Sequence, residues 1–299
     1  MDARQLGILR ELGELGSVRA VAEALLITPS AVSQQLQLLQ RTVAAPLTRR
    51  VGRTLKLTEA GAALAAAAVD VESALARARE LAGELGRTPG GTVTVSAFNS
   101  AARAFFPALA TAFPADGPVR VRLTDEDVEQ RSFAPLTAAY DVVLAHRFVH
   151  TAAWPAALTV TALLTEPLDV ALPAGHPLAT RRAISAAAAA RQPWIATHEG
   201  FPVGAIVDAL ATVAGHPVTV AHRVNEYSVA AELVAAGAGL ALLPRWTTPA
   251  PPGIVLRPLT GVRSARRVDA LVRPENAARS TVRMVLATLR ERARAVAGR

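Results

Sequence analysis

The sequence predicts an α/β protein that begins with a small all-α helix-turn-helix unit. Three observations predict this architecture. The chain has 299 residues, of which 51% are hydrophobic and 19% charged, which is enough for two or three well-packed domains. Residues 2–43 contain three short stretches in which apolar residues recur at helical spacing. From Thr92 onward, strand patterns such as TVTVSAF alternate with helical ones, as in βα units that build a parallel sheet.

Residues 17–43 hold two short helices separated by a turn. Ser17 suits the capping position of the first helix, and Thr28 and Pro29 suit the cap and first turn of the second. One face of the second helix is apolar, and its other face carries Ser30, Ser33, Gln34, Gln37 and Arg41. Hydroxyl and amide groups hydrogen-bond base edges in the major groove, which helix-turn-helix proteins enter with the start of this helix. The predicted DNA-reading residues are Thr28, Pro29, Ser30, Ser33, Gln34 and Gln37.

An ordinary solvated helix face is the alternative, and the charge of the neighbouring segment favours DNA. No acidic residue lies between Glu23 and Glu59, whereas that interval contains five basic ones, Arg41, Arg49, Arg50, Arg53 and Lys56. The segment 49–57 also alternates around a turn at Gly52, which is typical of a two-stranded wing. We expect Arg49, Arg50 and Arg53 to bind the phosphate backbone rather than to read sequence.

A long helix is predicted directly after the wing. Thr58 suits its cap, and apolar residues then recur at alternating spacings of four and three, namely Leu64, Ala68, Val71, Leu75, Ala78, Ala82 and Leu85. Such a seam packs either on its own domain or on a second copy, and self-association is favoured because a dimer presents two reading helices to a dyad-symmetric site. The predicted domains are 1–58 for DNA binding, 59–86 for the dimerisation helix, 87–91 for a hinge and 92–299 for the α/β part.

Composition excludes several other classes of protein. The chain has no cysteine, which excludes disulfides, thiolate metal sites and thiol-based redox sensing. No apolar run reaches the roughly 18 residues of a membrane-spanning helix, and charged residues interrupt any signal-peptide core near the start. We therefore expect a cytoplasmic protein with no membrane partner.

The amino-terminal segment resembles that of LysR-type transcriptional regulators. The resemblance rests on the residues at 22–25 (AEAL), 29–36 (PSAVSQQL), 46–47 (PL), Arg49 and 57–61 (LTEAG) in family order. The sequence differs from the family pattern at Gln40, Ala44 and Thr48, where Glu, Gly and a large apolar residue are usual. Family landmarks of the effector domain follow in FPAL, GHPLA and LVAAGAGLALLP, so the resemblance extends over essentially the whole chain.

This resemblance implies that residues 92–299 form a two-lobed α/β domain similar to periplasmic solute-binding proteins. The chain is expected to cross between lobes twice, which gives a first lobe of about 92–162 plus 267–299 and a second lobe of about 163–266. An unknown small-molecule effector is expected in the cleft. The other implied partners are double-stranded promoter DNA with dyad symmetry, further copies of the chain in a dimer or tetramer, and RNA polymerase if the protein is an activator. No cofactor is implied.

The cleft residues are expected at strand ends, where loops meet helix starts. Asn99 and Ser100 follow the first predicted strand and precede its helix, so they are placed to bind a polar ligand group, with plain helix capping as the alternative. Matching to the family's cleft adds Asp127, Thr197, His198, Glu199 and Tyr227. The acidic run around Asp127 is interpreted as solvated, so no metal site is predicted.

An enzyme is not expected. The chain contains no GxSxG, HExxH, GxxxxGK or complete GxGxxG motif. A solute-binding protein shares the two-lobed fold, but it needs an export signal and leaves residues 1–61 unexplained. The remaining alternative is a helix-turn-helix regulator whose carboxy-terminal lobes serve only oligomerisation.

Overall fold

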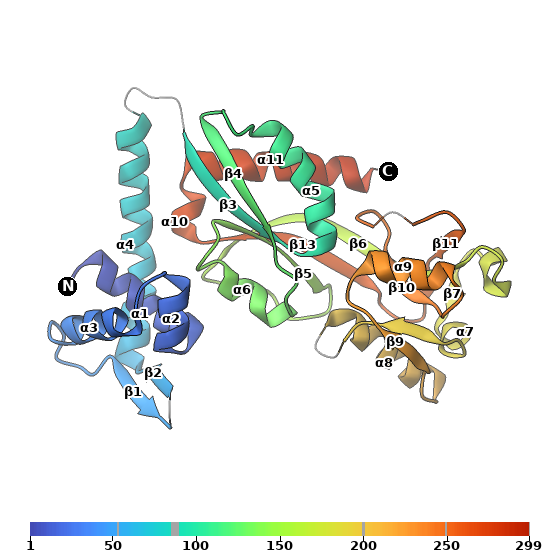
Figure 1. Ribbon diagram of the computed structural model, residues 1–299. Coiled ribbons are helices and arrows are strands. Elements are labelled where there is room, and N and C mark those ends of the chain that lie inside the picture. Colours follow the sequence, from blue (N-terminus) through green and yellow to red (C-terminus); the bar gives the residue numbers. More distant parts are fainter. Residues whose placement is uncertain (53, 85–89, 199–200, 249, 299) are drawn as a thin grey trace.

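A computed structural model of the chain describes residues 1–52, 54–84, 90–198, 201–248 and 250–298. In Figure 1 a helical unit lies at the lower left, one long helix rises from it, and the α/β part extends to the right. None of the helices in these ranges is long and apolar enough to cross a membrane.

The helical unit contains three helices and a strand pair, namely α1 (Ala3–Leu15), α2 (Val18–Ala24), α3 (Pro29–Gln40), β1 (Thr48–Val51) and β2 (Thr54–Leu57). The predicted caps are confirmed, because the hydroxyl of Ser17 accepts from the Ala20 amide and that of Thr28 from the Ala31 amide. The apolar faces meet in one core that includes Leu9, Leu12, Val21, Val32, Leu36 and Leu39. The helix-turn-helix and the antiparallel wing are thus formed as the sequence predicts.

Gln40 holds the loop between α3 and the wing. Its amide nitrogen donates to the carbonyls of Val43 (3.2 Å) and Ala45 (3.0 Å), and its carbonyl oxygen accepts from the Leu47 amide at 2.8 Å. A glutamate lacks the N–H groups that make the first two of these bonds. The departure from the family pattern at this position therefore has a structural role in this chain.

The long helix α4 (Glu59–Glu84) begins as predicted, with the Thr58 hydroxyl accepting from the Gly61 amide. The predicted apolar seam divides into two parts. Leu64 and Ala68 pack on the helical unit's own core. Val71 and Leu75, by contrast, are each 38% exposed, and Ala78 and Ala82 are exposed as well. Leu85 and residues 87–89 of the predicted hinge lie outside the described ranges.

The first part of the α/β region contains β3 (Gly91–Ala97), α5 (Asn99–Ala112), β4 (Val119–Asp125), η1 (Gln130–Ser132), α6 (Phe133–Leu136) and β5 (Val142–Phe148). Strands β4, β3 and β5 are parallel neighbours, as predicted. The sheet continues into β13 (Ala265–Val272) and then β6 (Thr159–Pro173). Strand β13 is antiparallel to both of its neighbours, β5 and β6. The expectation of a parallel sheet therefore holds for only part of it.

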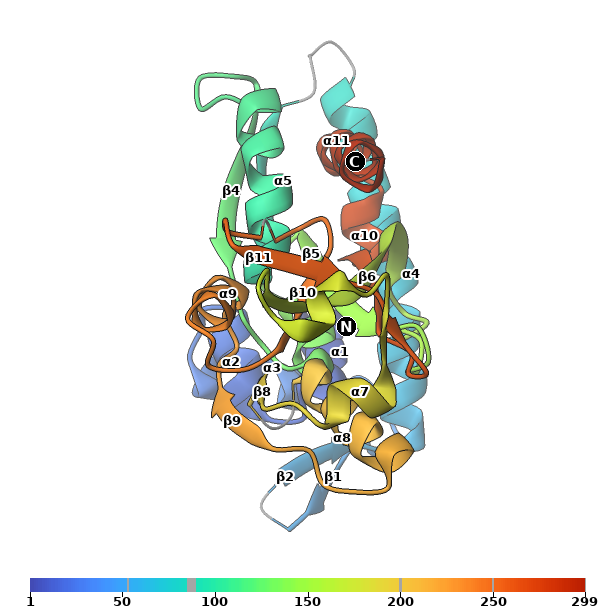
Figure 2. The same cartoon turned by 90° about the vertical axis from the view of Figure 1, so that its right-hand side faces the viewer.

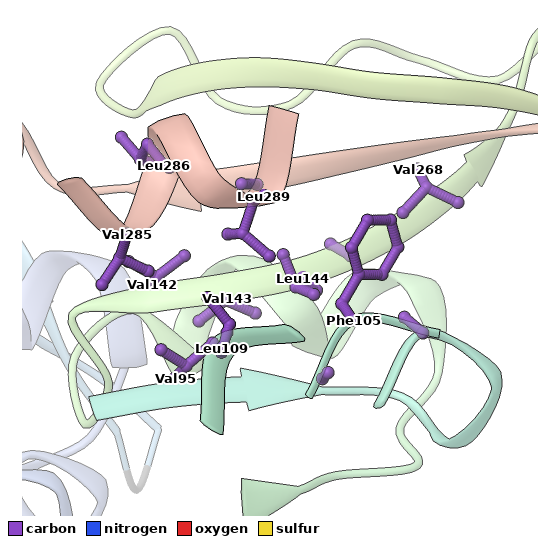
Figure 3. Packing of buried hydrophobic residues seen from close by; sticks show 14 of the residues in the cluster. Val95, Phe105, Leu109, Val142, Val143, Leu144, Val268, Val285, Leu286 and Leu289 are labelled. Carbon is purple, nitrogen blue, oxygen red and sulfur yellow. The ribbon is translucent and has the colours of Figure 1, made fainter. Parts of the chain in front are cut away.

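Two late helices complete this lobe, α10 (Pro274–Ala277) and α11 (Ser280–Ala297). Helices α5 and α11 pack against each other and against the sheet. In Figure 3, Leu286 and Leu289 of α11 and Phe105 and Leu109 of α5 lie around Leu144 of β5. Segments about 180 residues apart in the chain thus share one core.

The second lobe lies at the far right of Figure 1 and faces the viewer in Figure 2. Its elements are η2 (Pro177–Thr180), β7 (Ile184–Ser185), α7 (Ala186–Ala190), β8 (Trp194–Ala196), α8 (Pro202–Ala214), β9 (Val220–Arg223), α9 (Tyr227–Ala235), β10 (Ala241–Pro244), β11 (Ile254–Arg257) and β12 (Leu259–Thr260). Strand β6 pairs with β13 along its first half and with β10 and β11 along its second half. The predicted lobe boundaries at 162/163 and 266/267 fall within β6 and β13.

An ion network joins the helical unit to the α/β part. Arg273, directly after β13, donates to Glu11 and, at 2.7 Å, to Glu14 of α1. Arg10 of α1 donates to Glu72 of α4 at 2.6 Å and to Glu275 of α10 at 2.8 Å. The side chains of Arg10 and Arg273 are 3% and 8% exposed, so the network is shielded from water. Such shielding makes the loss of one partner costly.

We predict that Arg273→Met lowers the free energy of unfolding by about 3 kcal/mol, because it leaves the Glu11 carboxylate buried without its partner. Urea titration followed by circular dichroism measures the change. The matched control Arg103→Met, at an exposed position of α5, should change stability by less than about 0.5 kcal/mol. The double variant Arg273→Met/Glu11→Leu should recover part of the loss. Equal midpoints for Arg273→Met and the control would show that the network does not stabilise the fold.

Candidate functional site

The polar face of α3 is open to solvent at its start. Thr28, Pro29, Ser30, Gln34 and Gln37 are exposed. The hydroxyls of Thr28 and Ser30 lie 2.9 Å apart. Ser33 is half-buried and its hydroxyl donates to the Pro29 carbonyl at 3.0 Å, so without rotating it can only accept a hydrogen bond from a base. The two glutamine amides are therefore the side chains most directly available for base contacts.

The wing carries positive charge outward. Arg49 and Arg50 of β1 are exposed, and Arg49 lies opposite Lys56 of β2 in the strand pair. Arg53, the third predicted wing arginine, lies outside the described residues. Cationic side chains at neighbouring strand positions are suited to the phosphate spacing of a DNA backbone rather than to a base edge.

The second candidate site is built around a buried arginine between the lobes. Arg266 of β13 lies directly opposite Glu166 of β6, and its Nε and Nη2 donate to Glu166 Oε2 at 3.1 and 2.8 Å. Nη2 also donates to the hydroxyls of Ser100 and Thr247, each at 2.9 Å. Glu166 Oε1 accepts from the amides of Trp246 (2.8 Å) and Thr247 (2.7 Å). The pair thus ties α5, both crossing strands and the segment after β10 together.

Aromatic rings enclose the Arg266 guanidinium. Its central carbon lies 5.1 Å from the Phe98 ring centre and 5.6 Å from that of Tyr227, within the range of cation–π attraction. His146 of β5 contacts the same Phe98 ring, with ring centres 4.5 Å apart. Burial, together with the positive charge of Arg266, lowers the pKa of His146 to about 3. His146 is therefore neutral at physiological pH.

A cavity of about 30 Å³ opens beside Arg266, and the lobes meet around it. Five predicted effector residues line it, namely Asn99, Ser100, Asp127, Thr197 and Tyr227. His198 is not among the residues that line it, and its backbone amide donates to Asn225. Glu199 lies outside the described residues. Across the opening, Asn99 of the first lobe donates to Glu226 of the second at 2.6 Å.

Asn99 and Ser100 do not act as helix caps. The N-cap of α5 is Phe98, and no side chain caps this helix. The capping alternative is therefore wrong. Both side chains instead hydrogen-bond to residues outside α5. Asn99 donates to Glu226, directly before α9, and Ser100 accepts from Arg266 of β13.

Sequence reasoning missed several residues of this site, chiefly Arg266, Glu166, Glu226, Phe98 and His146. A charged residue within an apolar strand pattern, as at Glu166 in LLTEPLDVAL, was the available signal. A wider hollow of about 500 Å³ shares Phe201 with the small cavity and is lined on its other sides by residues such as Phe148, Val207 and Arg223. In the described ranges, no three His, Asp or Glu side chains gather as metal ligands do.

Comparison with known proteins identifies both parts of the chain. The family of the LysR substrate binding domain matches residues 86–294, and the bacterial regulatory helix-turn-helix protein, lysR family, matches residues 3–62. The chain is 31% identical to the HTH-type transcriptional regulator TtuA of Agrobacterium vitis over 83% of this chain and 81% of that one. It is 30% identical to the uncharacterized HTH-type transcriptional regulator YnfL of Escherichia coli over 77% of each.

Solved structures show a shared fold. A full-length OxyR variant from Pseudomonas aeruginosa superposes with a TM-score of 0.64 at 19% identity, covering 97% of this chain and 95% of that one. HinK, a LysR family transcriptional regulator from the same organism, gives a TM-score of 0.54 at 19% identity, with 97% of each chain covered. At these identities the similarity establishes the architecture and not the ligand.

We predict an acid-dependent loss of stability that originates at His146. The ordinary histidine pKa is 6.5, and that of folded His146 is about 3. Above pH 6.5 both folded and unfolded chains are neutral at this residue. Below it the unfolded chain binds a proton that the folded chain does not, so the free energy of unfolding falls by up to about 1.4 kcal/mol per pH unit.

Urea unfolding at pH 7 and pH 5 of the wild type and of His146→Gln tests this prediction. Between the two values the wild type should lose about 2 kcal/mol more than the variant, which has no group to titrate at this position. Parallel pH dependence in the two proteins would show that folding does not lower the pKa of His146.

Proposed function

Because the chain belongs to the LysR family of bacterial transcriptional regulators, we propose that it binds a dyad-symmetric promoter site as an oligomer and that a small molecule in the interlobe cleft changes its DNA contacts. The observation that carries the proposal is the presence, in one chain, of an exposed polar α3 face beside a basic wing and of a polar cavity between two lobes. Both parts match LysR family domains.

For DNA recognition, we assign sequence reading to the start of α3 and backbone binding to the wing. Gln34 and Gln37 are exposed on the polar face, with Thr28, Pro29, Ser30 and Ser33 at the end that enters the groove. Arg49, Arg50 and Arg53 bind phosphates and supply affinity that depends on salt. This division assigns specificity and affinity to different residues.

For assembly, we propose that two copies associate through α4. Its exposed residues Val71, Leu75, Ala78 and Ala82 continue the seam whose first part is already buried in the helical unit. Burying this face between two helices removes apolar surface from water. The resulting dimer places two α3 helices on one DNA duplex. RNA polymerase is the expected further partner if the protein activates transcription.

For control by the effector, we propose that strand β13 transmits the effect of ligand binding from the cleft to the DNA-binding unit. It holds Arg266 in the cleft at one end, and Arg273 follows its other end and binds α1. Seven residues of extended chain span about 23 Å. A ligand that separates the lobes or changes the contacts of Arg266 therefore acts on the strand that holds the DNA-binding unit. Such a ligand must bind one arrangement more tightly than the other.

A footprint of the purified protein on its own upstream DNA, across a salt series and with a panel of metabolites, tests this proposal. We expect protection of a dyad site that shifts or changes in extent with one metabolite. Protection that no metabolite changes would favour lobes that serve only oligomerisation. No specific protection would overturn the assignment of α3 and the wing.

We predict that Gln34→Ala and Arg50→Ala have different effects on DNA binding. Gln34→Ala should lower the preference for specific over unrelated DNA, by about 1–3 kcal/mol, because it removes a base contact. Arg50→Ala should weaken binding to both DNAs equally and reduce the slope of log K against log salt by about one. Fluorescence anisotropy with specific and unrelated duplexes measures both quantities.

The matched control is Gln192→Ala, a glutamine in the second lobe far along the chain from α3. It should leave affinity and specificity unchanged. A Gln34→Ala protein that keeps the full preference for its specific duplex would show that this face of α3 does not read bases.

A further inference from the structure

We propose that the cleft binds a small zwitterion of the α-amino acid class, with the ligand carboxylate on Arg266 and its ammonium group between Asp127 and Glu226. This inference rests on the proposed function, since it names the chemical class of the effector. Three features of the cavity carry it: a guanidinium nitrogen without a partner among the described residues, two carboxylates from opposite lobes that line the same cavity, and the bond from Asn99 to Glu226 across the opening.

The unused donor is Nη1 of Arg266. The side chain is 1% exposed, and its Nε and Nη2 are bonded to Glu166, Ser100 and Thr247. Nη1 is buried and has no hydrogen-bond partner in the described parts of the chain, although Arg266 lines the cavity. A buried N–H without an acceptor is costly, and a carboxylate oxygen is the acceptor that a guanidinium binds most strongly.

The two carboxylates make a simple anion a poor ligand. Asp127 follows β4 in the first lobe and Glu226 precedes α9 in the second, and both line the same cavity. Burial and the negative charges of Glu226 and Asp125 raise the pKa of Asp127. No donor within the described ranges bonds the Asp127 carboxylate. An ammonium group near both side chains relieves this repulsion, whereas a ligand with only a negative charge adds to it.

The cavity wall presents a guanidinium donor and two carboxylates, which favours a ligand that carries groups of both charges. Glu166 already compensates the charge of Arg266. Asp127 and Glu226 then remain as negative charges on the cavity wall, and His146 is neutral. A ligand that carries both a carboxylate and an ammonium group meets the Arg266 donor and these two acceptors at once. Neither an amine nor a carboxylic acid satisfies both sides of the cavity.

The closed cavity explains how such a ligand would act. Its volume of about 30 Å³ is close to the space of one water molecule in the liquid, so an amino acid fits only if the lobes separate. The contact it replaces is the 2.6 Å bond from Asn99 to Glu226, because the ammonium group competes for the same carboxylate. The hollow beyond Phe201 offers space for the ligand's side chain. Binding is thereby coupled to opening.

Isothermal titration calorimetry of the full chain with each common protein amino acid tests the proposal. For every amino acid that binds, the carboxylic acid without the amino group and the amine without the carboxyl group are titrated as matched probes. We expect at least one amino acid to bind and both probes to bind more weakly, by about tenfold or more. A carboxylic acid that binds as tightly as its amino acid, or a folded protein that binds no amino acid, would overturn the proposal.

Variants test the binding of the ligand's carboxylate and ammonium groups separately. Asp127→Asn should weaken amino acid binding by about tenfold and leave that of the carboxylic acid probe unchanged or stronger. Asp116→Asn, in an exposed turn, should change affinity by less than about twofold. Arg266→Lys tests the binding of the ligand carboxylate. If Arg266→Lys does not fold, Asp127→Asn still tests the binding of the ammonium group. Equal binding by Asp127→Asn and wild type would contradict the proposed ammonium site.

Failure of this inference is distinguishable from failure of the proposed function. Footprinting without added ligand reports DNA recognition alone, and it should be the same for Asp127→Asn and wild type. A specific footprint with no amino acid binding would refute the ligand class and leave the regulator intact. Amino acid binding without a specific footprint would refute the DNA-binding proposal instead.

Discussion

The buried pair of Arg266 and Glu166 is the interaction on which the two-lobed part depends. The two residues lie opposite each other on the strands that cross between the lobes, and their side chains are 1% and 0% exposed. Charges taken out of water are tolerated only when geometry is good and the remaining hydrogen bonds are satisfied. The backbone amides of Trp246 and Thr247 donate to Glu166, and the hydroxyls of Ser100 and Thr247 accept from Arg266, which supplies most of these hydrogen bonds. The pair therefore fixes how the crossing strands, α5 and the second lobe meet.

Helix caps and the helix-turn-helix were predictable because their signals are local. Ser17, Thr28 and Pro29 each act within one helical turn, so the residues alone define the helix starts. The cavity was predictable in part for a similar reason, since Asn99 and Ser100 follow a strand and open a helix. Arg266 and Glu166 are 100 residues apart and meet only through the register of β6 and β13. No local pattern specifies that register.

The long helix shows a different limit of sequence reasoning. Heptad spacing indicates an apolar seam but not what covers it. In α4 the first part of the seam packs on α1 and its neighbours, where Ala68 is fully buried, whereas Leu75 further along is 38% exposed. Leu64 belongs to the first part and the exposed Ala78 and Ala82 to the second, so side-chain size does not separate the two parts either. What covers each part depends on where the rest of the helical unit packs against α4.

His146 does not change the charge of the cleft within the physiological pH range. A second positive charge beside Arg266 would sit within the same ring of aromatic groups, where water does not screen it. Burial and Arg266 instead keep His146 neutral, with a pKa of about 3, so this residue stays uncharged throughout the physiological range. Among the described residues, Arg266 is the one arginine that lines the cavity, and its Nη1 has no hydrogen-bond partner there. Ligand selection then depends on which molecule offers an acceptor to that nitrogen while tolerating the two carboxylates opposite.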